Sequence, residues 1–171
     1  MSEVRLETER LRLRPAGIRD VDEYVALSED PEVTRFVDAL DARAAEERLR
    51  ANEREWRDRG HGMFALLDRR DGRFLGRAGL KYWPQFDETE VGWVLRRDVW
   101  GRGYASEAAS AILDWGFAVV PATYFTAMID PDNDRSIRVA RRLGLTPLRR
   151  DVLVGDPVVV YAVAREDWVG A

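Results

Sequence analysis

The chain has 171 residues, 46% of them hydrophobic, which predicts a single compact domain over residues 1–171. It contains no cysteine, which excludes disulfides, thiolate metal sites and a cysteine nucleophile. The net charge of -4 at pH 7 argues against nucleic acid as the main partner. The sequence has neither a signal-like N-terminus nor the apolar run of about 20 residues that a membrane span needs. We therefore expect a cytoplasmic protein that binds no membrane.

The first half of the chain predicts a strand, two helices and a hairpin. Leucines and arginines alternate in the strand at residues 11–15. Asp20 is expected to begin a helix, because Glu23 lies three places later as in a capping box, and Asp30-Pro31 ends that helix. A second helix over residues 41–60 and a hairpin of strands over residues 64–67 and 74–82 complete this half.

The second half continues the alternation of strands and helices. Hydrophobic periodicity predicts strands over residues 88–95 and 123–129, helices over residues 105–119 and 134–143, and a closing hairpin of residues 146–154 and 158–164. This order of elements predicts an α+β fold, an α/β sandwich in which helices flank a mixed sheet.

Residues 100–107, with the sequence WGRGYASE, form a glycine-bearing turn between a predicted strand and a predicted helix. Glycines let the backbone approach a ligand, and the first turn of the helix offers unpaired N–H groups at the positive end of its dipole. This arrangement suits a pyrophosphate, although such a turn is equally consistent with a purely structural role. The patterns of P-loop kinases and Rossmann dehydrogenases do not occur.

A second segment, residues 133–145 with the sequence NDRSIRVARRLGL, follows the strand predicted at residues 123–129. Together with the turn, it resembles the GCN5-related N-acetyltransferases, in particular the RimJ/RimL-type branch of ribosomal-protein N-terminal acetyltransferases and their relatives that acetylate small molecules. In that family the pattern Q/R-x-x-G-x-G/A wraps the coenzyme A pyrophosphate. Residues 100–105 occupy this pattern here, with Trp100 in place of Gln or Arg.

The resemblance covers nearly the whole chain and implies the GNAT fold. That fold has a mixed, mostly antiparallel central sheet of about seven strands, splayed between two central strands, which here are residues 90–95 and 123–129. Acetyl-CoA is expected to lie in the opening. The residues that the resemblance places at the coenzyme are Val94, Leu95, Gly101, Arg102, Gly103, Tyr104, Ala105, Ser106, Asn133 and Ser136.

The resemblance also assigns the chemistry. A backbone N–H near Val94 or Leu95 would polarise the acetyl oxygen. Ser136 stands in the N-x-x-S pattern at which this branch places a hydroxyl near the coenzyme sulfur, and the position of the general-acid tyrosine of other branches is Ala140. Hydrogen bonding within the first turn of its helix is the alternative role for Ser136. Glu90 is the expected general base, and an exposed carboxylate without a role is the alternative.

These features predict an acetyl-CoA-dependent N-acetyltransferase that needs no metal and transfers the acetyl group directly to a primary amine. The acceptor is left open between a protein N-terminal α-amine and a small-molecule amine. An acyl-CoA-binding sensor without turnover is one alternative function, and a nucleotide-binding interaction domain that prefers ATP or NAD to coenzyme A is another. The resemblance is also compatible with a homodimer.

Overall fold

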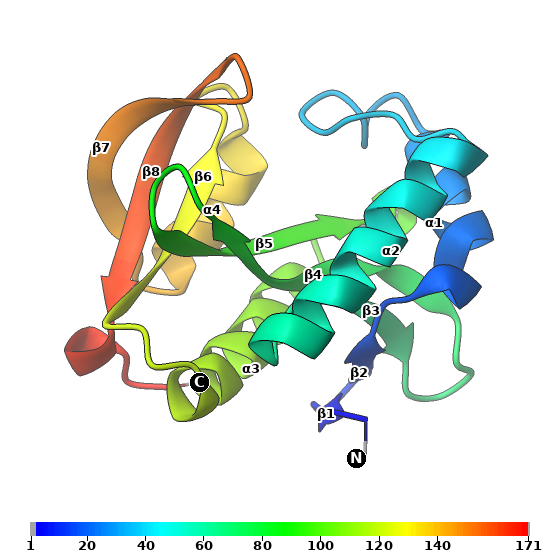
Figure 1. Ribbon diagram of the computed structural model, residues 1–171, viewed down its shortest axis with the longest axis horizontal. Helices are drawn as coiled ribbons and strands as arrows, with labels where there is room; N and C mark the ends of the chain where they lie inside the picture. The colour runs from blue at the N-terminus through cyan, green and yellow to red at the C-terminus, as the bar shows by residue number, and fades with distance from the viewer. Residues whose placement is uncertain (1–2, 171) are drawn as a thin grey trace.

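The computed structural model describes residues 3–170 and contains one mixed sheet flanked by helices on both faces (Figure 1). The sheet has eight strands in the order β1-β2-β3-β4-β5-β6-β8-β7. The predicted α+β sandwich is confirmed, and the eighth strand is the short β1, which pairs with β2 ahead of the first predicted strand. The strands are β1 (Leu6–Glu7), β2 (Leu11–Pro15), β3 (Met63–Asp68), β4 (Phe74–Trp83), β5 (Glu88–Leu95), β6 (Tyr124–Ile129), β7 (Thr146–Leu153) and β8 (Asp156–Ala164).

Four α-helices cover the sheet, and each face has its own apolar cluster. Helices α3 and α4 contribute Ile112 and Ala140 to the larger cluster, while α1 and α2 contribute Tyr24 and Leu49 to the smaller cluster on the other face. Within residues 3–170, no helix combines the length and the apolar character needed to cross a bilayer. The helices are α1 (Val21–Ser28), α2 (Ala42–Arg59), α3 (Tyr104–Val119) and α4 (Asp134–Arg142).

The start of α1 differs from the predicted capping box. Asp20 makes no side-chain hydrogen bond to the first turn of α1. Its buried carboxylate instead accepts two hydrogen bonds from the Arg14 guanidinium, at 2.9 and 2.8 Å, and one from the Gly17 N–H at 3.0 Å. A bidentate charged partner binds a carboxylate more strongly than a neutral N–H does, so Asp20 ties the helix to β2 rather than capping it.

The sheet splits between β5 and β6, the two strands for which a splay is predicted. They are the one parallel pair among the described strands, and their pairing is confined to Glu90 opposite Thr126. Beyond this point, towards Leu95 and Ile129, the two strands diverge. The predicted splay is therefore confirmed, and the ends of β5 and β6 face each other across an opening.

A buried carboxylate holds the closed end of this split together. Glu88 on β5 accepts hydrogen bonds from the Tyr124 hydroxyl on β6, at 2.8 Å, and from the Arg149 guanidinium on β7, at 3.0 Å. Hydrogen bonding to Arg149, followed by that to Tyr124, lowers the pKa of Glu88 and keeps it ionised. We call these three residues the Glu88 clasp, because they join strands from both sides of the split.

Candidate active site

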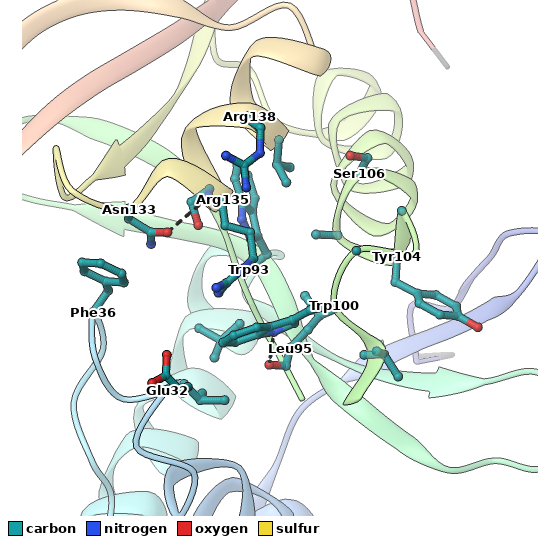
Figure 2. A pocket seen from close by; sticks show the side chains of 18 of the residues that line it. Glu32, Phe36, Trp93, Leu95, Trp100, Tyr104, Ser106, Asn133, Arg135 and Arg138 are labelled. Atoms are coloured by element: carbon teal, nitrogen blue, oxygen red, sulfur yellow. Dashed lines mark hydrogen bonds between the residues drawn. The ribbon is translucent and has the colours of Figure 1, made fainter. Parts of the chain in front are cut away.

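The open end of the split forms a cleft between four parts of the chain (Figure 2). The first turns of α3 and α4 lie on opposite sides, β5 lies between them, and the loop between α1 and α2 lies at one end. The cleft brings together nine of the ten residues predicted to bind coenzyme. They are Val94, Leu95, Gly101, Gly103, Tyr104, Ala105, Ser106, Asn133 and Ser136.

The glycine-bearing turn enters α3 in the left-handed region of backbone conformation. Gly101 has φ of 74° and Gly103, the N-cap of α3, has φ of 81°. A β-carbon at Gly101 would have no atom within 4 Å, and one at Gly103 would meet only Arg10 Nη2, at 3.5 Å. The protein thus leaves open space at the N-terminus of α3, where unpaired N–H groups favour an anion.

Arg102 is the predicted coenzyme ligand that does not line the cleft. Its carbonyl accepts a hydrogen bond from Arg10 Nη1 at 2.9 Å. Arg10 is held in turn by Glu107 in the first turn of α3, with its Nε 2.7 Å from the carboxylate, and Thr8 donates to the same carboxylate at 2.6 Å. Arg102 therefore fixes the conformation of the turn through its backbone.

The first turn of α4 places a hydroxyl in the cleft. Asn133 is the N-cap, and its Oδ1 accepts from the Ser136 N–H at 3.2 Å. This cap uses the backbone of Ser136 and leaves the hydroxyl available to line the cleft. The side chain of Ala140, one turn further on, is fully buried in the core and does not line the cleft, whereas Ser136 does.

The backbone of β5 directs some of its N–H groups into the split. Arg96 N–H donates to Leu75 O on β4 at 2.8 Å, and the β4–β5 register continues without a bulge. N–H groups alternate in direction along a strand, so Val94 N–H also points to β4. Leu95 N–H and Trp93 N–H point the other way, towards the opening. Of the two predicted amides, Leu95 is the one directed into the cleft.

An aromatic and cationic contact crosses the cleft and was not predicted. The Arg135 guanidinium lies 3.4 Å from the centre of the Trp100 ring, and Trp100 Nε1 donates to Leu95 O at 2.9 Å. The sequence carries no signal for this contact, because cation–π partners have no fixed spacing. The sequence also did not predict that the loop between α1 and α2 lines the cleft. Glu32 and Phe36 line the cleft from this loop, and the loop has no hydrophobic periodicity that could indicate its position.

The α4 side of the cleft is rich in positive charge. Arg135, Arg138 and Arg142 line it, and Arg142 Nη1 lies 3.4 Å from Ser106 Oγ across the cleft. Guanidinium groups at this position suit the phosphates of a nucleotide. Over residues 3–170, no three His, Asp or Glu side chains gather closely enough to hold a metal ion.

Glu90 lies at the apex of the split, outside the residues that line the cleft. Its side chain is half-buried on the face of the sheet covered by α1 and α2, and Trp83 Nε1 donates to Glu90 Oε2 at 3.3 Å. Burial raises the pKa of Glu90 to about 7, against the opposing effects of Trp83, Lys81 and the Met128 N–H. A carboxyl group with this pKa exchanges protons near neutral pH.

The chain is similar to known proteins over nearly its whole length. Residues 10–146 match the acetyltransferase (GNAT) domain family. A Bacillus subtilis (strain 168) protein named uncharacterized protein YkkB is 36% identical over 166 residues, covering 94% of this chain and 95% of that protein. An acetyltransferase from Agrobacterium tumefaciens strain C58 has a similar structure, with a TM-score of 0.82, 31% identity and 95% of both chains covered.

The fold is also similar to that of RimL, a ribosomal L7/L12 α-N-protein acetyltransferase, in its complex with coenzyme A. The TM-score is 0.79 at 19% identity, and the match covers 94% of this chain and 98% of that one. At this identity the likeness establishes a shared fold.

Proposed function

Because the chain belongs to the acetyltransferase (GNAT) family and is an acyltransferase, we propose that it transfers the acetyl group of acetyl-CoA directly to a primary amine. The observation that carries the proposal is the cleft at the split of β5 and β6. It combines an open glycine turn at the N-terminus of α3 with arginines and a hydroxyl on the facing helix α4. These groups match the pyrophosphate and the thioester of acetyl-CoA.

In the proposed reaction, the neutral amine nitrogen attacks the thioester carbonyl carbon and the C–S bond breaks. The N–H of Leu95 or Trp93 stabilises the negative charge that develops on the carbonyl oxygen. Glu90 accepts the proton that the amine loses, directly or through a water molecule, and Ser136 donates a proton to the departing thiolate. The chain contains no cysteine, which supports transfer without a thioester intermediate on the protein.

For the acceptor we retain a protein N-terminal α-amine or a small-molecule amine. An α-amine has an ordinary pKa of about 7.7 to 8.0, whereas a lysine side chain has one of about 10.4. A carboxyl group with a pKa near 7 is a sufficient base for an α-amine. Its pKa is further from that of a lysine amine, so it is a less effective base for lysine.

The proposal is tested by the release of free thiol from acetyl-CoA in the presence of amines and N-terminal peptides. We expect release that depends on the acceptor and saturates with acetyl-CoA. Binding of coenzyme A, seen as a thermal shift, without thiol release for any acceptor would instead favour a sensor. A ligand at a hundred times its dissociation constant adds about 2.7 kcal/mol of stability, so the thermal shift is easily measured.

Ser136→Ala is expected to lower kcat by about a hundredfold, the order of effect of losing one proton donor, with little change in the Kd of coenzyme A. Ser106→Ala is the matched control, because Ser106 is also the third residue of a helix and also lines the cleft. Its loss should weaken coenzyme binding and leave kcat nearly unchanged. Equal kcat in the Ser136→Ala variant and the wild type would assign Ser136 a structural role.

A further inference from the structure

Lys81 is the only lysine in the chain. Lysine and arginine together number 27, so the other 26 of these residues (27 - 1) are arginines. The single primary amine among the side chains is therefore at one defined place, on β4. In the register of the sheet it lies directly opposite Glu90 on β5.

Lys81 and Glu90 contact the same indole ring. Lys81 Nζ lies 4.2 Å from the centre of the Trp83 ring, and the Nε1 of that ring donates to Glu90 at 3.3 Å. Cross-strand partners point to the same face of a sheet, so the amine and the carboxylate lie side by side at the apex of the split. This is the point from which β5 and β6 diverge to form the cleft.

The surroundings of Lys81 make its charged form less favourable than it is in water. Desolvation lowers the pKa of Lys81, and the positive charges of Arg48 on α2 and Arg77 on β4 lower it further. Glu55 on α2 and Glu90 on β5 act in the opposite direction without reversing the shift. Lys81 is nevertheless exposed to solvent, and its side chain is long and flexible.

From this placement we propose that Lys81 is a site of self-acetylation, modified by the acetyl-CoA that the same molecule binds. The inference rests on the proposed use of acetyl-CoA. Lys81 Nζ attacks the thioester carbonyl, the C–S bond breaks, Glu90 takes the proton lost by the nitrogen, and the thiolate leaves to be protonated as coenzyme A. The products are Nε-acetyl-lysine at position 81 and free coenzyme A.

The modification would change the site itself. Acetylation replaces the cation opposite Glu90 with a neutral amide. Lys81 is one of the charges that favour the ionised form of Glu90, so its loss disfavours the carboxylate that serves as the base. Self-acetylation therefore acts against acetyl transfer to other amines.

The test is incubation of the full chain with acetyl-CoA and no acceptor, followed by cleavage after arginine and mass spectrometry. Lys81 then lies in the peptide of residues 78–96, which contains no other lysine. The probe protein carries Arg43→Lys, which places a second lysine on a highly exposed site of α2. This lysine reports uncatalysed acetylation in the same tube.

We expect Lys81 to be acetylated at least about tenfold faster than the lysine at position 43, because the proposal gives the bound thioester a high effective concentration at Lys81. The rate should be independent of protein concentration, saturate with acetyl-CoA and vanish in a Gly103→Val background. Lys81→Arg should abolish the modified peptide.

Equal rates at positions 43 and 81, or a rate that rises with protein concentration, would overturn the inference. If external amines are acetylated while Lys81 is not, the inference fails and the proposed function stands. If neither Lys81 nor any external amine is acetylated although coenzyme A binds, both fail.

Discussion

Gly103→Val is expected to weaken the binding of coenzyme A by at least about a hundredfold, which corresponds to about 2.7 kcal/mol. Two effects combine at this position. A β-branched residue is strained at φ of 81°, so the turn would have to change the direction of its N–H groups. The new side chain would also occupy the space at the N-terminus of α3 in which we place the pyrophosphate. Calorimetric titration with coenzyme A measures the change.

Gly72→Val separates binding from stability. Gly72 lies in the loop between β3 and β4, with φ of 76°, and a β-carbon there would meet no atom within 4 Å. Backbone strain should therefore lower the melting temperature in both variants by a similar amount, while Gly72→Val keeps the wild-type Kd. Wild-type affinity in the Gly103→Val variant would remove the pyrophosphate from this turn.

Glu90→Gln is expected to lower kcat/KM by about a hundredfold or more, because the amide cannot accept the proton of the amine. In the wild type, kcat/KM should fall as the pH decreases through about 7, the pKa of Glu90. In the variant the part of this limb that belongs to Glu90 should be absent, which leaves only the titration of the acceptor amine. A pH–rate profile between about pH 5.5 and 8.5 measures both effects.

The same substitution should make the folded protein more stable at alkaline pH. Burial raises the pKa of Glu90 from 4.5 to about 7, so between these values the folded state binds more protons than the unfolded state. The free energy of unfolding therefore decreases as the pH rises through this window, and the ionised carboxylate costs most above pH 7. Glutamine avoids this cost, which predicts a gain of about 2 kcal/mol in denaturant unfolding above pH 7 and little gain near pH 4.5.

Glu55→Gln is the control for both measurements. Burial also raises the pKa of Glu55, whose carboxylate accepts from the Tyr82 N–H at 2.7 Å on the same face of the sheet. The acidic limb should survive in this variant. An acidic limb that is unchanged in the Glu90→Gln variant but reduced to the titration of the acceptor amine with Glu55→Gln would reassign the base.

The parts of the site that the sequence predicts are those with a local cause. The turn at Gly101 and Gly103 and the first turn of α4 at Asn133 each consist of neighbouring residues, and glycine and asparagine have specific roles there. The same holds for the strands and helices, which follow from hydrophobic periodicity. The splay of β5 and β6 was expected only from family resemblance, because periodicity does not specify which strands pair.

What could not be predicted depends on contacts between distant residues. Asp20 has the spacing of a capping residue, yet its carboxylate binds the guanidinium of Arg14 instead of the N–H groups in the first turn of α1. Arg135 stacks on Trp100 from another element, 35 residues away in the chain (135 - 100). The raised pKa of Glu90 likewise arises from burial by the folded chain, so this support for its proposed role as a base is not visible in the sequence.

The Glu88 clasp has a consequence for how the molecule opens. Few polar contacts connect β1–β5 to β6–β8 within the sheet. They include one ladder pair, the clasp and a hydrogen bond from Thr126 Oγ1 to Thr89 O at 3.5 Å, while the apolar cluster beneath α3 spans both parts. Amide hydrogen exchange should therefore divide the sheet into two cooperative units, with the three C-terminal strands exchanging through a partial unfolding of lower free energy than global unfolding. A ligand wedged between the units would slow exchange in both at once, far from any atom that it contacts.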